Sequence, residues 1–324
     1  MVDLQQEIKP DQVAVVIPTH NSRHWIDGCI ESIVAQGDGP VVQIVDNGST
    51  DGTPDHVEAR WPNVMVLRLS SNLGYAGGVN AGAELWPRHH VLALNVDTVV
   101  GRGALARLVA TMAAERRVAL VAPRLLEADG RLQRSVHEFP SLAGFARQAV
   151  GVKRTVSPTR QSSQEESAET PFEIDWASGA ALLVRREAWD EVGGFDPSYR
   201  FFVEEVDLER RLRDAGWSVL LEPRAEVTHY GGAHPIPAAR FALAHDGWER
   251  YFGSRFGRPR QFAARALLCG VAISRCALWV VRALVRPASR SESLRWARMF
   301  AAVTLLSAAK LPGAALRRHR PYTG

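Results

Sequence analysis

Cysteine is scarce in this 324-residue chain, which contains only Cys29, Cys269 and Cys276. No two of them form a CxxC pair, so the sequence predicts neither a disulfide framework nor a structural zinc site. The first twelve residues also lack the basic start and the apolar centre of a secretory signal. Both absences fit a location on the cytoplasmic side of the plasma membrane.

Extremes of composition are absent as well. Hydrophobic residues make up 46% of the chain and charged residues 23%, which excludes the disordered, collagen-like and coiled-coil classes. No internal repeat is evident. The length allows one large α/β domain or two small ones.

The formal net charge of +4 is unevenly distributed. Gly253–Gly324 carries fourteen Lys and Arg residues against one acid, a formal charge of +13, which leaves −9 on the rest of the chain. A basic tail on an acidic body indicates an anionic partner, either a phosphorylated surface or a nucleic acid.

The tail has the pattern of two amphipathic helices. In the first, arginines fall within an arc of about 100° and leave an apolar face opposite. These arginines are Arg265, Arg275, Arg282 and Arg286. Because Arg275 interrupts the uncharged run, the segment is shorter than the about 20 apolar residues of a membrane span, and we expect an in-plane interfacial helix. The second helix follows Pro287, where Ser289 and Glu292 have capping-box spacing, and continues over Leu294–Leu311.

Packing on the main domain and nucleic-acid binding are the two alternatives to membrane binding by the tail. Helices that only pack on a domain usually carry charges of both signs, whereas these carry an excess of arginine. Nucleic-acid binding is disfavoured because the basic residues alternate with long apolar runs and no recognised reading module is present. Peripheral attachment to an anionic membrane is favoured, because each basic residue near such a surface contributes about 1 kcal/mol of binding free energy.

Short β-branched runs alternate with stretches of helical period, which predicts an α/β fold with a mostly parallel sheet and crossover helices. The expected strands are Val13–Ile17, Val41–Val45, Val64–Leu69, Val91–Val96, Val118–Ala122, Ala180–Val184, Val219–Leu221 and Val227–His229. The expected helices are Trp25–Gln36, Asp51–Arg60, Ala76–Trp86, Gly103–Glu115 and Val206–Ala215. Lys153–Pro171 is rich in Ser, Thr, Gln and Glu, and we expect a mobile loop there. The implied division is a domain over residues 11–250, with halves 11–125 and 172–250, and a tail over residues 251–324.

Polar residues follow the first four expected strands, at the edge where an open parallel sheet binds its ligand. They are Pro18-Thr19-His20-Asn21, Asp46-Asn47-Gly48-Ser49, Ser71-Asn72-Leu73-Gly74 and Asn95-Val96-Asp97. Asp46 ends its strand, where its carboxylate is placed to accept hydrogen bonds from a base or a ribose. Asp51 has instead the spacing of an Asx turn or a helix cap. Gly74–Gly78 lacks the spacing of the known phosphate-binding loops and is a weak signal alone.

Asp97 follows the apolar run Val91–Leu94, where a carboxylate is desolvated unless a cation or hydrogen-bond donors accompany it. A divalent cation held by one or two carboxylates and by ligand phosphates is the usual solution. His229 is either a core histidine or, if it lies close to Asp97, a further ligand.

Three acids, Glu204, Glu205 and Asp207, stand at the start of a helix. Part of their role is to complement the helix dipole. Two adjacent carboxylates beside aromatic residues also favour a raised pKa on one of them, which a general base requires.

Five motifs occur in order along the chain: Val15–Asn21, Val45–Gly52, Asn72–Asn80, Asn95–Asp97 and Glu204–Leu208. Together they resemble the motifs of family 2 glycosyltransferases of the GT-A fold, particularly the rhamnosyltransferase-like bacterial branch, over Val13 to His234. The resemblance implies that a nucleoside-diphosphate sugar lies across the strand ends. The residues it assigns to this donor are Pro18, Thr19 and Asn21 near the nucleoside, Asp46 at the base, Asn72, Gly74 and Asn80 along the ribose and diphosphate, and Asn95.

The resemblance also implies a metal site. Asp97 corresponds to the last acid of the family's DxD-type motif, Asn95 takes the place of another acid, and His229 completes the site for Mg²⁺ or Mn²⁺. In that arrangement the cation neutralises charge on the departing diphosphate.

A carboxylate then removes the proton of the acceptor hydroxyl, and attack from the opposite face inverts the anomeric centre. Glu205 is the expected base. The family commonly has Glu-Asp where this chain has Glu204-Glu205, so Glu204 and Asp207 stay as alternatives. The acceptor is expected to meet a segment that includes Trp176, Ser178 and Gly179.

The resulting hypothesis is an inverting, metal-dependent glycosyltransferase that moves a sugar, with L-rhamnose from dTDP-rhamnose as the favoured donor, to a glycan or a lipid-linked cell-envelope precursor. A nucleotidyltransferase is disfavoured because Pro18–Asn21 offers neither glycine nor lysine to a triphosphate. A catalytically silent membrane scaffold is disfavoured because Asp46, Asp97, Glu205 and His229 are all present. No oligomeric state follows from the sequence.

Overall fold

The computed structural model describes residues 12–37, 39–87, 89–149, 160–199, 202–231, 238–286 and 289–308. The chain forms two compact units. The first comprises Met1–Phe139, Pro158–Arg200 and Glu204–His234, and the second comprises Pro140–Ser157, Phe201–Val203 and Pro235–Gly324.

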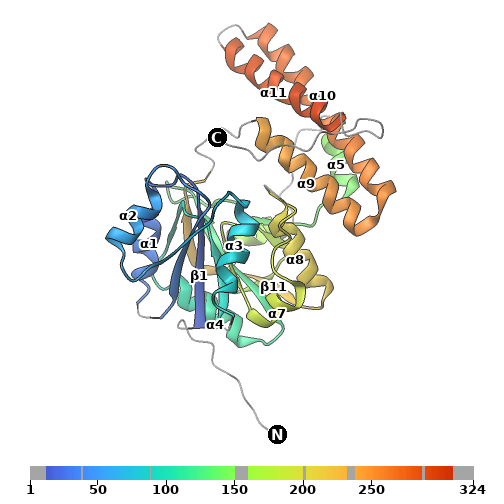
Figure 1. The fold of residues 1–324 in the computed structure, drawn as a ribbon. Helices are drawn as coiled ribbons and strands as arrows, with labels where there is room; N and C mark the ends of the chain where they lie inside the picture. The colour runs from blue at the N-terminus through green and yellow to red at the C-terminus, as the bar shows by residue number, and fades with distance from the viewer. Residues whose placement is uncertain are drawn as a thin grey trace. The chain divides into compact units, whose positions relative to one another are not determined.

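A mixed sheet forms the centre of the first unit (Figure 1). The strands of this unit are β1 (Val13–Thr19), β2 (Val41–Asp46), β3 (Met65–Arg68), β4 (His90–Leu94), β5 (Thr98–Val100), β6 (Val118–Leu126), β7 (Val136–His137), β8 (Phe172–Glu173), β9 (Trp176–Ala177), β10 (Ala181–Val184) and β11 (Ser218–His229). β3, β2, β1 and β4 pair in parallel, and antiparallel β10 joins β4 to β6, which pairs in parallel with β11. The carboxyl ends of β1 to β4, β6 and β11 therefore share one edge.

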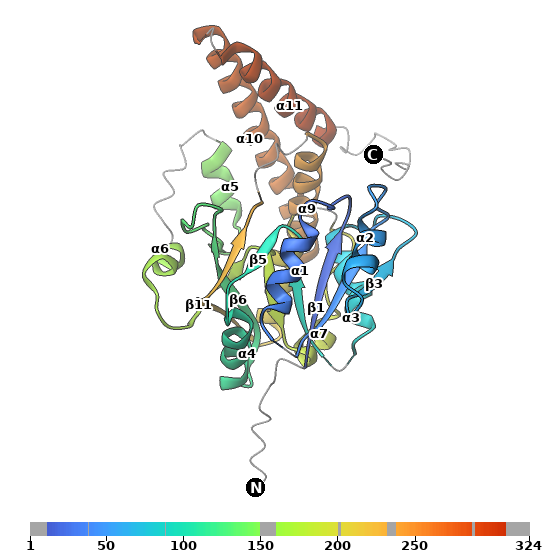
Figure 2. The same cartoon turned by 90° about the vertical axis from the view of Figure 1, so that its left-hand side faces the viewer.

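Helices cover both faces of this sheet. Those of the first unit are α1 (Ile26–Val34), α2 (Thr53–Arg60), α3 (Gly74–Glu84), α4 (Ala104–Ala114), α6 (Arg160–Ser167), α7 (Arg186–Val192) and α8 (Glu204–Asp214). Residues of α1, α2 and α4 pack on one face, and residues of α3, α7 and α8 pack on the other (Figure 2). The expected α/β class with a mostly parallel sheet is confirmed.

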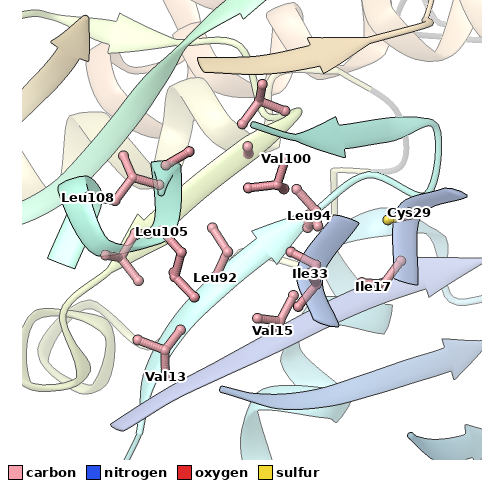
Figure 3. Packing of buried hydrophobic residues seen from close by; sticks show 14 of the residues in the cluster. Val13, Val15, Ile17, Cys29, Ile33, Leu92, Leu94, Val100, Leu105 and Leu108 are labelled. Carbon is pink, nitrogen blue, oxygen red and sulfur yellow. The ribbon is translucent and has the colours of Figure 1, made fainter. Parts of the chain in front are cut away.

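The alternation of side chains along β1 explains why both faces are apolar. Val13, Val15 and Ile17 enter the core under α1 and α4, whereas Ala14 and Val16 enter the core under α3. Figure 3 shows the first of these cores, where side chains of β1 and β4 meet those of α1 and α4. A strand buried on both faces is typical of a parallel sheet.

Two expectations need correction. The strands expected at Val219–Leu221 and Val227–His229 are one strand, β11, which continues through a register shift between Glu222 and Glu226. The loop expected over Lys153–Pro171 contains a helix, α6. Its first part, residues 153–159, lies outside the described residues.

One buried carboxylate explains the order in α6. Glu165 is fully buried, and its Oε1 accepts hydrogen bonds from the backbone N–H and the hydroxyl of Ser135 at 3.1 and 2.7 Å. Arg124 donates in turn to the carbonyls of Glu165 and Ala168. Composition predicts a loop here because these anchors are single polar contacts rather than an apolar stripe.

The second unit contains α5 (Leu142–Ala149), α9 (Ala238–Phe256), α10 (Arg258–Val285) and α11 (Arg290–Ala308). The last two correspond to the two expected tail helices, although residues 309–311 lie outside the described part of the chain. The expected boundary at residue 250 falls inside α9. Arg265 of α10 pairs with buried Glu249 of α9 at 2.9 Å, so α9 belongs with the tail helices.

α10 and α11 pack through one face and leave an apolar face exposed. Trp279 stacks on Trp296 with ring centroids 5.8 Å apart, and Ala272, Phe300 and Val303 are buried beside them. Exposed apolar side chains on α10 are Phe262, Ile273, Leu278, Val280, Val281, Leu284 and Val285. Within the described ranges, α10 alone is long and apolar enough to cross a membrane by length and composition. Its apolar stretch is thus longer than the interruption at Arg275 predicts.

Candidate active site

The ends of β1 and β2 lie side by side. Thr19 pairs in register with Asp46, and both side chains are almost fully buried. The Asp46 carboxylate accepts one hydrogen bond from the backbone N–H of Ser49 at 3.1 Å. The Thr19 hydroxyl is buried and has no hydrogen-bond partner among the residues that the structure describes. A buried hydroxyl without a partner is uncommon in proteins, which makes Thr19 a candidate for a functional role.

Asparagine side chains tie the loops after these strands together. Asn21 adopts a left-handed conformation, with φ of 52°, and its side-chain oxygen accepts a hydrogen bond from the N–H of Thr50 at 2.8 Å. Buried Asn47 accepts one from the N–H of Leu73 at 3.1 Å, which links the β2 end to α3. Asn47 was missed by sequence analysis, although it stands next to Asp46 in the same polar motif.

The loop before α3 is shaped by the predicted residues Asn72 and Gly74. The Asn72 side-chain oxygen accepts a hydrogen bond from the N–H of Gly74 at 2.8 Å, and Gly74 has a φ of 76°, which favours glycine. Asp51 forms the expected Asx turn, since its carboxylate accepts a hydrogen bond from the N–H of Thr53 at 3.0 Å. These side chains define the shape of the loops.

Two residues assigned to the donor make contacts inside the protein instead. Both polar atoms of the Asn80 amide bond the backbone of Phe195, at 2.8 and 3.1 Å. A Cβ at Gly78 would lie 3.0 Å from the ring of Pro18, so Pro18 is covered by α3. We therefore leave Asn80 and Pro18 out of the proposed donor contacts.

Asp97 and His229 come together where β5 pairs with β11. The Tyr230 N–H donates to the Asp97 carbonyl at 2.9 Å, and His229 Nε2 lies 3.5 Å from Asp97 Oδ1. Asn95 Nδ2 lies 3.4 Å from the same Nε2 atom. The condition stated for His229, that Asp97 be close, is met.

The donor set at this point suits Mg²⁺ or Mn²⁺ only in part. Nowhere in the described ranges do three or more His, Cys, Asp or Glu side chains group to hold a metal ion. Asp97 supplies one carboxylate of the usual magnesium site, in which substrate phosphates and water supply the remaining ligands, whereas the imidazole of His229 lies outside that oxygen set. The residues present therefore fit a cation that binds together with a diphosphate.

The three acids of the first turn of α8 differ in their partners. Asp207 accepts a hydrogen bond from Arg211 Nε at 2.7 Å and another from the Tyr199 hydroxyl at 3.4 Å. Burial and the charge of Glu205 raise the pKa of Glu204 well above its usual value. Burial next to a second carboxylate thus favours the protonated form of Glu204.

The chain before α8 is strained. Phe202 and Val203 have φ values of 56° and 81°, in the left-handed region that a β-branched residue such as Val203 rarely adopts. Strain of this kind concentrates at functional sites, where the surrounding structure holds it.

Tyr75 links the two groups of acids, and sequence analysis missed it. Its hydroxyl donates to the Gly179 carbonyl at 2.8 Å. Burial, followed by the charges of Glu204, Glu205 and Asp97, raises the pKa of Tyr75 well above its usual 10.0. Gly179 in turn packs against Glu205, so the Tyr75 hydroxyl is bonded to a residue beside the expected base. Its place within Gly74–Gly78 was the only signal in the sequence.

The predicted acceptor segment runs past Glu205. A Cβ at Gly179 would lie 3.4 Å from that of Glu205. Ser178 donates its N–H to the Ser135 carbonyl at 2.9 Å. Trp176 stacks on His137 with centroids 4.4 Å apart, so one face of its ring is already covered.

Comparison with known proteins decides the family. Residues 14–193 match the family model described as "Glycosyl transferase family 2". An N-acetylglucosaminyl-diphospho-decaprenol L-rhamnosyltransferase of Mycobacterium tuberculosis is 33% identical over 302 residues, which cover 88% of this chain and 98% of that protein. The chain belongs to glycosyl transferase family 2. It is a glycosyltransferase.

Solved structures agree with the fold of this glycosyltransferase. The mannosyltransferase PcManGT from Pyrobaculum calidifontis, solved with GDP-Man and Mn²⁺, superimposes with a TM-score of 0.55 at 18% identity and covers 92% of this chain and 86% of its own. GalNAc-T7 with UDP, GalNAc and Mn²⁺ has a TM-score of 0.51 at 16% identity, over 75% of this chain and 50% of that one. At these identities the likeness establishes the GT-A fold alone.

Proposed function

We propose that this glycosyltransferase transfers L-rhamnose from dTDP-rhamnose to a lipid-linked glycan precursor, with a divalent cation and with inversion of the anomeric centre. The observation that carries the site is the approach of His229 Nε2 to Asp97 Oδ1 at 3.5 Å, together with the hydrogen bond from the Tyr75 hydroxyl to Gly179, the residue that packs against Glu205. The transferred sugar and the acceptor class rest on the relative at 33% identity, whose name specifies both, and dTDP as the carrier of that sugar rests on the resemblance of the motifs.

Each group has a role in this proposal. Thr19 and Asp46 receive the nucleoside at the strand ends, and Asp97 and His229 hold Mg²⁺ or Mn²⁺ beside the diphosphate. A cation bound there supplies neutralisation of the charge that develops on the leaving group. Glu205 takes the proton from the acceptor hydroxyl. Because Glu204 is protonated, it adds no second negative charge beside Glu205.

The tail is proposed to attach the enzyme to the anionic cytoplasmic face of the membrane, where a lipid-linked acceptor resides. Exposed Arg275 and Arg282 lie on the same helix as the exposed apolar face of α10, and exposed Arg286 follows its last residue. Arg265 does not contribute to lipid binding, since it pairs with Glu249. The combination of apolar and cationic surface fits a helix lying in the interface.

The test is a transfer assay with the purified full-length protein, Mg²⁺ or Mn²⁺, and a short-chain N-acetylglucosaminyl-diphospho-polyprenol. With dTDP-L-rhamnose we expect equal amounts of rhamnosylated lipid and dTDP, and no product in EDTA. Asp97→Ala should abolish transfer, whereas Asp129→Ala, an exposed acid elsewhere in the first unit, should retain it. Exclusive use of another nucleotide sugar would overturn the rhamnose assignment, and release of rhamnose 1-phosphate in place of dTDP would indicate transfer of the nucleotidyl group.

A further inference from the structure

We propose that Gln133 is a positioning residue that holds His229 in the tautomer able to bind a cation. This inference rests on the cation site of the proposed function. Gln133 stands outside every motif considered above, in the segment between β6 and β7, whereas His229 ends β11.

Two hydrogen bonds join the residues. His229 Nδ1 lies 2.7 Å from Gln133 Oε1, and Gln133 Nε2 donates to the His229 carbonyl at 3.3 Å. An amide oxygen only accepts hydrogen bonds, so Nδ1 carries the hydrogen. The opposite orientation of the amide would set oxygen against the carbonyl oxygen, so the second bond fixes the first.

The neutral ring then has its lone pair on Nε2. That atom faces Asn95 Nδ2 at 3.4 Å, which donates to it, and Asp97 Oδ1 at 3.5 Å. The Nε2 lone pair of His229 thus lies beside the Asp97 carboxylate, the other expected ligand of the cation. Histidines that bind metals usually donate their other ring N–H to an oxygen acceptor, and loss of that acceptor costs metal affinity.

Gln133 is itself anchored. Its backbone N–H donates to the Leu125 carbonyl at 2.9 Å, next to the point where β6 pairs with β11 at Leu125 and Val227. The acceptor oxygen is therefore held by the sheet itself.

The first test reads the tautomer directly, without metal. In ¹⁵N-histidine-labelled full-length protein at pH 8, ring nitrogen shifts identify the protonated nitrogen of His229, with His229→Gln used to assign the signal among the ten histidines. We expect hydrogen on Nδ1 in the wild type and a mixture of tautomers in Gln133→Leu. Hydrogen on Nε2 in the wild type would overturn the inference.

The second test reads cation affinity. Free Mn²⁺ is measured by electron paramagnetic resonance with the wild type, Gln133→Leu, Gln133→Glu and Gln36→Leu, each with and without dTDP. Gln36 is a matched control, since it is a half-buried glutamine that bonds backbone carbonyls under α1. We expect Gln133→Leu to weaken Mn²⁺ binding by about 10–100-fold, and Gln133→Glu, which retains an acceptor, to restore it. Gln36→Leu should bind as the wild type does.

Equal Mn²⁺ affinity in Gln133→Leu and the wild type would overturn the positioning role. If the wild type bound no Mn²⁺ even with dTDP, while Nδ1 carried the hydrogen, the cation site of the proposed function would fail and the tautomer assignment would stand. The two failures are therefore distinguishable.

Discussion

Four carboxylic acids occupy the first two turns of α8, and all are buried. Glu204, Glu205 and Asp207 are 7%, 7% and 6% exposed, and Glu209 is fully buried. Burial of so many carboxylates is tolerated because an ion pair or protonation lowers the cost of their desolvation. Asp207 pairs with Arg211, and burial raises the pKa of both Glu204 and Glu209 so that they keep their protons.

Glu205→Gln is expected to lower kcat by about 10²–10⁴-fold with little change in KM for the donor, because an amide does not accept the proton. Glu204→Gln should lower kcat far less, since a protonated carboxyl and an amide have the same shape and charge. Steady-state kinetics of the two variants, with exposed Glu187→Gln as control, measures the difference. A greater loss in Glu204→Gln would reverse the two roles.

Glu209→Gln is expected to stabilise the enzyme at neutral pH while preserving the hydrogen bond from the N–H of Ala177. Burial, with the charge of Glu205, raises the pKa of Glu209 above its usual 4.5, so the folded state holds this proton more tightly than the unfolded chain. The contribution of this group to the stability of the wild type is thus fully present below pH 4.5 and is lost as pH rises through the folded-state pKa. Calorimetry should show a Tm a few degrees higher for the variant at pH 8, and no difference near pH 4. A difference independent of pH would contradict the buried, protonated state.

At the scale of elements, glycines on α3 set how closely that helix lies on the sheet. A Cβ at Gly82 would meet Val16 Cγ1 at 2.4 Å and Val45 Cγ2 at 2.9 Å. Gly82 therefore serves helix–sheet packing, and Gly74 alone among the glycines of α3 has a left-handed backbone.

Gly82→Ala should destabilise the protein by about 1–3 kcal/mol, because the added methyl overpacks a buried contact. Gly28→Ala on α1 is the matched control. Its added Cβ meets nothing within 4 Å, so helix propensity should stabilise the protein by about 0.5–1 kcal/mol. Urea denaturation of both variants gives the two signs. Stabilisation by Gly82→Ala would show that α3 is free to move away from β1.

The elements that the sequence predicts well are those whose signal is local. Apolar runs predict the buried strands, and the polar residues after them predict the edge where Asp97 meets His229. The segments missed, such as β5, β7, β9 and α6, are short: the three strands are held by pairing with strands distant in the sequence, and α6 is held by single polar contacts. Tyr75 and Gln133 were missed for the same reason, because their roles depend on Gly179 and His229, which lie 104 and 96 residues away along the chain.

At the scale of the whole molecule, the uneven charge acquires a structural basis. The acidic part carries the buried carboxylates of α8, and the basic part carries the exposed face of α10. Some of the positive charge has a purely structural use, as in the pair of Arg265 and Glu249.

Arg275→Gln with Arg286→Gln, in the full-length protein, should weaken binding to vesicles rich in anionic lipid by about 30-fold. This estimate takes about 1 kcal/mol per basic residue and 1.4 kcal/mol per tenfold. Arg102→Gln with Arg107→Gln removes the same charge from exposed positions of the first unit and should leave binding unchanged. Flotation at low and high salt measures both, and binding should weaken as salt rises. Equal binding to zwitterionic vesicles would contradict an electrostatic contribution.

The central claim is that one site joins a cation held by Asp97 and His229 to a base at Glu205. The most direct measurement is a crystal structure of the full-length enzyme with Mn²⁺ and dTDP, in which anomalous scattering locates the metal. We predict a peak at coordination distance from the Asp97 carboxylate, His229 Nε2 and the diphosphate, with the nucleoside beside Asp46 and with Glu205 free of the metal. A peak on Glu204 or Glu205, or a nucleotide bound away from the ends of β1 and β2, would contradict the account.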